Sequence, residues 1–217
     1  MVCFCKDTTF SENITELTKK MYFCSLMNSL SNLDSDLFLF LNGLHADWLD
    51  GPMIAITQMW AWAPIYLLLI YWIVKQYSKR SWWIILAVCF VVLCSDQLSS
   101  HVLKPYFQRL RPCFNKDFEG LLHLPLGLAG GRFSFTSSHA ANTFAIATFL
   151  SAALQKFRPW SAILLFFWAL LSSYSRIYIG FHYPGDIVCG AILGTLVGLV
   201  LWKVFQIVQK KVWKSEQ

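Results

Sequence analysis

The feature that most constrains this sequence is an uncharged apolar run from Met53 to Val74. About 20 such residues are enough for a helix to cross a bilayer. Of the 217 residues, 56% are hydrophobic and only 14% are charged, and the mean hydropathy is +0.49. So few charges cannot cover a soluble globule with hydrated side chains. The composition therefore favours an integral membrane protein over a soluble or a disordered one.

Four further segments have a similar composition, and they are residues 82–103, 140–155, 160–175 and 187–202. The apolar segment Asp34–Leu44 is too short to span, and a longer span there would bury Asp34 and Asp36 at a cost. We therefore expect an all-α integral membrane helical bundle with five transmembrane helices and an N-terminal interfacial helix, six spans being the alternative. We divide the chain into a polar N-terminal segment (1–32), a membrane domain (33–209) and a basic cytoplasmic tail (210–217).

Basic residues gather where the spans would emerge on one side of the membrane. They follow the first, third and fifth spans, at residues 75–80, 156–158 and 203–214. The positive-inside rule makes that side cytoplasmic. This distribution accounts for much of the net charge of +6, and we expect no nucleic-acid partner. The loops on the opposite side also carry cations, which the rule does not explain.

Helix parity brings three polar clusters to that opposite side. Two precede the third span and one lies between the fourth and fifth, and their members are Lys104, Arg111, Ser137, Ser138, His139, Arg176, His182 and Asp186. Three permanent cations match the charge of a phosphomonoester, and arginine grips phosphate oxygens in a fork. Hydroxyl residues at a helix start add a phosphate cradle.

The two histidines and the carboxylate supply the chemistry of phosphoryl transfer. Asp186 could hold the proton on one ring nitrogen of His182 and leave the other nitrogen free to attack phosphorus. His139 could protonate the departing oxygen. The pattern predicts a site without a metal or other cofactor.

The ordered pattern Lys104-x6-Arg111-Pro112, Thr136-Ser137-Ser138-His139 and Ser175-Arg176-x5-His182-x3-Asp186 resembles the signature of the type 2 phosphatidic acid phosphatase family. The resemblance covers residues 35–205. It implies a metal-independent phosphatase in which His182 forms a phosphohistidine, Asp186 orients it and His139 is the general acid. Lys104, Arg111, Ser137, Ser138 and Arg176 would bind the phosphate.

The second part of the pattern departs from the Pro-Ser-Gly-His that is usual in the family. Thr136 replaces the proline and Ser138 replaces the glycine. If the glycine position needs a positive φ, Ser138 would be strained. This departure concerns the role of Ser138 rather than that of His139.

The substrate that the resemblance implies is a phosphorylated membrane lipid. The segment SFTSSHAAN, with LNGLH before it, resembles Gram-negative envelope members, which favours lipid A dephosphorylation at the periplasmic face of a bacterial inner membrane. Undecaprenyl diphosphate is the runner-up, with phosphatidylglycerol phosphate and phosphatidate behind it. Two other classes remain open: a lipid phosphotransferase, and a non-catalytic transporter or scaffold.

Three features have two interpretations each, and a loop gives one further expectation. Asp96 lies four residues before Ser100 and eight before Lys104, so it either steadies the lysine or hydrogen-bonds within the bundle. Arg109 and Arg132 either touch a head group or are solvated. We expect the apolar residues of the 113–135 loop to lie against lipid. Gly190, Gly194 and Gly198 favour close packing within the bundle, with a dimer contact as the alternative.

Overall fold

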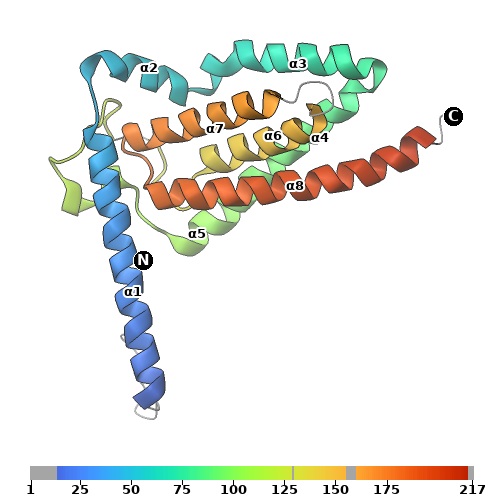
Figure 1. Ribbon diagram of the computed structural model, residues 1–217. Coiled ribbons are helices and arrows are strands. Elements are labelled where there is room, and N and C mark those ends of the chain that lie inside the picture. Colours follow the sequence, from blue (N-terminus) through green and yellow to red (C-terminus); the bar gives the residue numbers. More distant parts are fainter. Residues whose placement is uncertain (1–13, 129, 155–159, 215–217) are drawn as a thin grey trace.

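The computed structural model describes residues 14–128, 130–154 and 160–214, and they form an all-α bundle (Figure 1). Within them, the isolated bridge between Leu110 and Phe133 is the one β pairing. The elements in chain order are α1 (Ile14–Gly43), α2 (Asp47–Thr57), η1 (Met59–Trp62), α3 (Ala63–Tyr77), η2 (Ser78–Arg80), α4 (Ser81–Asp96), η3 (Gln97–Leu103), α5 (Lys104–Phe107), η4 (Pro112–Phe114), η5 (Lys116–Phe118), α6 (Ser138–Leu154), α7 (Ser161–Tyr178) and α8 (Pro184–Lys214).

Helix α6 is the centre of the bundle. It packs against α4, α7 and α8, and most of its residues are buried. Its many alanines allow close approach, and α8 meets it with a stripe of glycines. A Cβ at Gly190 would lie 2.6 Å from the carbonyl oxygen of Ser137, and one at Gly194 would collide with that of Ala141. The expected role of these glycines in packing within the bundle is confirmed.

Three helical stretches are long and apolar enough to cross a membrane among the described residues: 60–107, 161–178 and 184–211. The first stretch contains both α3 and α4, which reverse direction at η2 and pack side by side (Figure 1). The second, third, fourth and fifth segments expected from the sequence correspond closely to α4 with η3, to α6, to α7 and to α8. The chain is thus a helical bundle of a membrane protein.

The first expected span is wrong as one continuous helix. Helix α2 ends at Thr57, the backbone of Gln58 is extended, and α3 begins at Ala63. Pro64 favours a new helix start at this place, because a proline in the first turn loses no hydrogen bond, whereas inside a continuous helix it would remove one. The indole Nε1 of Trp62 donates to the carbonyl oxygen of Ile56, 2.7 Å away, and satisfies the end of α2.

The helix expected over residues 34–44 is the last part of the much longer α1. In Figure 1, α1 lies across one end of the bundle, and the chain's C-terminal end lies at the other. Both α1 and α8 are continuous across the domain boundaries proposed at residues 32 and 209. Because α1 crosses the end of the bundle, it places Asp34 beside the start of α8.

Candidate active site

The polar clusters expected to meet do meet, at the end of the bundle crossed by α1. The backbone N–H of Ser137, just before α6, donates to the carbonyl oxygen of Asp186 in the first turn of α8, at 3.2 Å. Nζ of Lys104 donates to Oγ of Ser138, at 2.8 Å. The backbone N–H of His182 donates to the carbonyl oxygen of Arg176, at 3.3 Å. These bonds tie α5, α6, α7 and α8 together at one place.

His182 and Asp186 form a buried pair at the centre of this site. Nδ1 of His182 lies 3.5 Å from Oδ2 of Asp186, and the two side chains are 4% and 0% exposed. The separation is a contact rather than a short hydrogen bond, as is common before substrate binds. Oδ2 also accepts from the backbone N–H of Tyr183, at 3.0 Å.

Burial lowers the pKa of His182 to about 4, against the opposing effect of Asp186. The charges of Arg111 and Lys104 act in the same direction as burial, which places both cations within electrostatic reach of the ring. The imidazole is therefore neutral at physiological pH, and one nitrogen can keep a lone pair. That is the protonation state a nucleophilic histidine needs.

The cations are arranged around the pair. Lys104 interacts electrostatically with Arg111, Arg176 and Asp186. Arg111 is held by a hydrogen bond from its Nε to the carbonyl oxygen of Phe133 and lies 5.0 Å from the ring centroid of Phe181. Arg176 donates to the carbonyl oxygen of Thr57, at 3.3 Å. Three cations that repel one another in a half-buried site are arranged to receive an anion.

The two serines have partners that refine their expected roles. Oγ of Ser137 accepts from the backbone N–H of Ala140, at 3.4 Å, so its hydroxyl hydrogen can still point to a phosphate. Ser138 is the first residue of α6 and does not have a positive φ, so the strain considered from the sequence is absent. Its hydroxyl lies 2.8 Å from that of Ser100 as well as contacting Lys104.

Asp96 is connected to Lys104 as one interpretation of the sequence suggested. Oγ of Ser100 donates to Oδ1 of Asp96, at 3.3 Å. The same hydroxyl is hydrogen-bonded to that of Ser138, which accepts from Lys104. Asn142 also donates to Oδ1 of Asp96, at 3.3 Å. The π-helical turn η3 lies between Asp96 and Lys104 and widens the helix just before the site.

Arg109 is a residue of the site that the sequence left undecided. It donates to Oδ1 of Asp186, at 2.9 Å, and to Oδ2 of Asp34, at 2.7 Å, and lies 3.8 Å from the ring centroid of Tyr183. Asp34 also accepts from the backbone N–H of Gly185, at 2.7 Å. This pairing resolves the cost of an acid in an apolar segment. Two features of the sequence could have indicated this pairing: Asp34 is an acid in an apolar segment and needs a partner, and Arg109 is a cation two residues before Arg111.

The 113–135 loop packs mainly on protein, which corrects the expectation that its apolar residues lie against lipid. Cys113 and Leu124 pack around Tyr178 and Phe181, and Phe118 contacts Phe38 and Tyr183. Leu121 and Leu128 are exposed. The loop thus covers the α7–α8 turn that carries His182.

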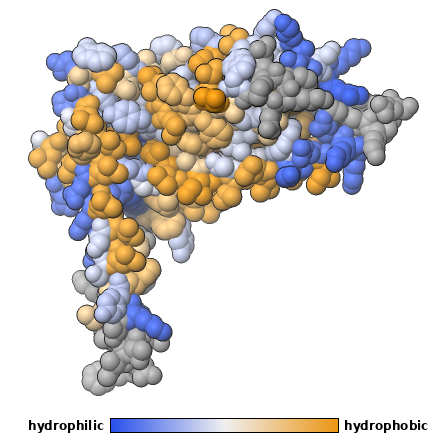
Figure 2. Space-filling view, viewed as in Figure 1, coloured by the Kyte–Doolittle hydropathy of each residue, from blue (hydrophilic) through white to orange (hydrophobic). Residues whose placement is uncertain are grey.

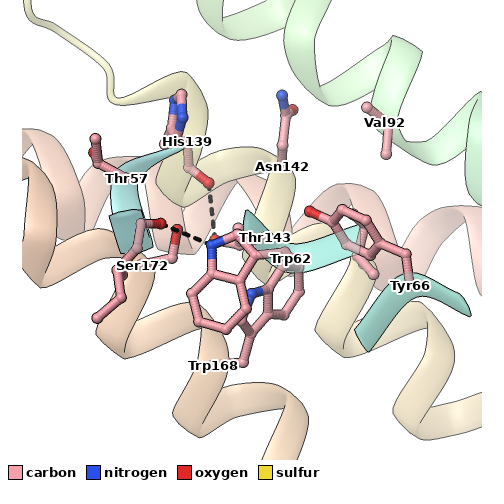
Figure 3. Close-up of a pocket in the computed structure, with 11 residues that line it drawn as sticks. Thr57, Trp62, Tyr66, Val92, His139, Asn142, Thr143, Trp168 and Ser172 are labelled. Carbon is pink, nitrogen blue, oxygen red and sulfur yellow. Dashed lines mark hydrogen bonds between the residues drawn. The ribbon is translucent and has the colours of Figure 1, made fainter. Parts of the chain in front are cut away.

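His139 lies in the first turn of α6 and borders a cavity of about 240 Å³ inside the bundle. Figure 3 shows His139 and Asn142 extending in the same direction from α6, with Trp62, Tyr66 and Trp168 nearby. Nε2 of His139 has no hydrogen-bond partner among the described residues, so it is available to a bound molecule. His139 interacts electrostatically with His182, Arg176 and Lys104, which places it at the same site.

Comparison with known proteins agrees with this arrangement. Residues 82–210 match the PAP2 superfamily. Lipid A 4'-phosphatases of Bacteroides thetaiotaomicron and Porphyromonas gingivalis are 36% and 34% identical to the chain, cover 82% of it in both cases, and are themselves covered over 79% and 75% of their lengths. The crystal structure of a PAP2-type phosphatidylglycerolphosphate phosphatase from Bacillus subtilis has the same fold, with a TM-score of 0.62 at 22% identity, over 83% of this chain and 88% of that one. The chain therefore belongs to the PAP2 superfamily and is a membrane lipid phosphatase.

Proposed function

We propose that the chain removes the 4'-phosphate of lipid A at the periplasmic face of the inner membrane. The observation that best supports this proposal is the buried His182–Asp186 pair, which lies among three cations. The chain that carries it is 36% identical to a lipid A 4'-phosphatase. The names of the two relatives favour this lipid over undecaprenyl diphosphate, phosphatidylglycerol phosphate and phosphatidate.

In the first step, a ring nitrogen of neutral His182 attacks phosphorus, and the bond from phosphorus to the lipid oxygen breaks. Asp186 holds the proton on Nδ1, so the attacking atom is Nε2. His139 takes up a proton from solvent when the anionic phosphate binds among the cations, and gives this proton to the departing lipid oxygen. Lys104, Arg111 and Arg176 stabilise the charge on the equatorial phosphate oxygens, and the hydroxyl of Ser137 donates to one of them.

In the second step, water replaces His182 on phosphorus. His139, now neutral, takes a proton from the attacking water, and the phosphorus–nitrogen bond breaks to release inorganic phosphate and the free imidazole. Transfer to a lipid hydroxyl instead of water would make the chain a phosphotransferase. The phosphatase and the phosphotransferase differ only in the molecule that accepts the phosphoryl group from His182. Identifying the products therefore distinguishes the two activities.

The membrane orientation is supported by the distribution of charge. Lys79 and Arg80 at the α3–α4 turn and Lys210 and Lys211 near the end of α8 lie away from the catalytic end (Figure 1). Hydrophilic residues occupy both ends of the bundle in Figure 2, with an apolar band between them. Lys156 and Arg158 lie outside the described residues. Basic residues opposite the site support an orientation in which the site faces away from the cytoplasm.

A substrate panel on the purified chain tests the proposal. Equal concentrations of lipid A, undecaprenyl diphosphate, phosphatidylglycerol phosphate and phosphatidate are compared in detergent micelles, and released phosphate is measured. We expect the highest kcat/KM on lipid A, with loss of the 4'-phosphate by mass spectrometry. A higher kcat/KM on another lipid, loss of the other phosphate, or a phosphorylated lipid product without free phosphate would each contradict it.

A further inference from the structure

The cavity beside His139 contains an unusual concentration of unpaired polar atoms. Within the described residues, four buried polar atoms around this one cavity lack a hydrogen-bond partner: Thr57 Oγ1, His139 Nε2, Asn142 Oδ1 and Trp168 Nε1. The side chains of Thr57 and Trp168 are each only 5% exposed. Because unpaired polar groups in a protein interior are costly, so many at one cavity indicate a polar occupant.

Aromatic rings form another part of the cavity wall. Trp168 lies edge-on to Trp62 and to Tyr66, with ring centroids 5.9 Å and 6.0 Å apart. Figure 3 shows these three rings on the same side of the cavity residues of α6. Rings together with a few hydrogen-bonding groups are typical of a site that fixes the orientation of a small amphipathic group.

The position of the cavity identifies which part of a substrate it faces. His139 borders it, and in the proposed reaction His139 gives a proton to the leaving oxygen. The leaving group must therefore begin at His139, on the side away from the attacking His182. A volume of about 240 Å³ equals about eight waters at roughly 30 Å³ each, so it admits one ring and not a whole lipid.

We propose that this cavity binds the hydroxylated sugar ring that carries the phosphate in a glycolipid substrate. Thr57, Asn142 and Trp168 hydrogen-bond to ring substituents, and the aromatic wall contacts the apolar face of the ring. An acyl chain would leave all of these polar atoms unpaired, which makes it a poorer occupant. The inference rests on the proposed function and assigns specificity to residues outside the sequence pattern that carries the chemistry.

Two substitutions test it, namely Thr57→Val and Trp168→Phe. Thr57→Val is nearly isosteric and removes one hydroxyl, whereas Trp168→Phe removes the indole N–H and leaves a smaller aromatic ring. We expect kcat/KM on lipid A to fall about tenfold for each, since a site that hydrogen-bonds its substrate loses binding when a partner is missing. On phosphatidate, whose leaving group has no sugar ring, we expect a change of less than about twofold.

Matched controls come from elsewhere in the bundle. Thr148 on α6 is also buried, its Oγ1 also lacks a partner among the described residues, and it does not line the cavity. Trp202 lies edge-on to Phe149 and does not line the cavity. Thr148→Val and Trp202→Phe should leave the ratio of kcat/KM on the two lipids unchanged, and the thermal midpoint of each variant reports folding.

The outcomes are distinct. An equal loss on both lipids would mean that Thr57 and Trp168 act only structurally, and no loss on either would mean that the cavity holds water; each result overturns the sugar site. Inhibition by dephosphorylated lipid A gives a second measurement, and it should weaken in Thr57→Val. Failure of the proposed function looks different, because then lipid A would not be the preferred substrate of the wild-type chain.

Discussion

The described part of the chain contains two histidine–aspartate pairs, and the one with the shorter contact is not the one at the candidate active site. Nε2 of His123 lies 2.8 Å from Oδ1 of Asp50, whereas the corresponding contact between His182 and Asp186 is 3.5 Å. The His123 pair is more open, with side chains 16% and 26% exposed. Distance alone would select the wrong pair.

The surroundings of the pairs distinguish them. His123 stacks on His45 at 3.9 Å, and Asp50 accepts a hydrogen bond from the hydroxyl of Tyr178, which lowers the pKa of the Asp50 carboxyl. This pair fastens the 113–135 loop to α2 and α7. Asp186 instead pairs with Arg109, and His182 lies within electrostatic reach of Arg111 and Lys104. Burial and neighbouring charge, rather than a short contact, therefore favour the His182 pair as the candidate for chemistry.

Removing the buried histidine should have the largest effect. His182→Ala should lower kcat for phosphate release by about 10³-fold or more, because the nucleophile is lost. The rate is measured on lipid A in micelles, with the thermal midpoint as a control for folding. Activity within tenfold of wild type would show that His182 is not the nucleophile and would remove the basis of the comparison.

Arg109 should come next, since it binds Asp186 and Asp34 together. Arg109→Ala should destabilise the chain by about 3 kcal/mol, because a fully buried carboxylate loses its cation. We expect kcat to fall by roughly tenfold to a hundredfold as Asp186 loses its fixed position. Asp34→Asn should also lower the stability and kcat, by smaller amounts than Arg109→Ala does.

The matched control for this prediction is Arg132→Ala, which removes an exposed arginine from the 113–135 loop. Its thermal midpoint and kcat should stay near wild type. If Arg132→Ala and Arg109→Ala behave alike, the contacts of Arg109 to the two carboxylates do not support the site.

Acid should weaken the fold through His182. The pKa of this histidine is about 4 in the folded chain and about 6.5 when it is exposed, so the unfolded chain takes up the proton first as the pH falls. Stability contributed by the neutral ring is full above about pH 6.5 and is lost towards pH 4, by up to about 3 kcal/mol. Thermal midpoints at pH 7 and pH 4.5 measure the loss, which should shrink in His182→Gln. An equal loss in that variant would assign the acid sensitivity to other groups.

The second pair should give the smallest effect. His123→Ala removes the contact to Asp50 and the stack on His45, so we expect a lower thermal midpoint and a kcat within about threefold of wild type. A loss of kcat comparable to that of His182→Ala would reverse the assignment of the two pairs.

The sequence was sufficient to predict four of the bundle helices, α4, α6, α7 and α8, and the meeting of three polar clusters at one end. These predictions follow from the length of the apolar segments and from helix parity. The break at Gln58 interrupts a continuous apolar run, and the bond between Asp34 and Arg109 joins residues far apart in the chain. The cavity beside His139 depends on how α2, α3, α4, α6 and α7 come together. Such features arise from tertiary packing, which the periodicity of apolar residues in the sequence does not specify.

The seam between α6 and α8 has a consequence for how this molecule tolerates change. At Gly190 and Gly194 only a hydrogen atom fits against the neighbouring backbone, and this seam connects the segment bearing His139 to the one bearing Asp186. A single added methyl there would push α6 and α8 apart and change the spacing between His139 and Asp186. Two residues without side chains thus set the geometry of the candidate active site.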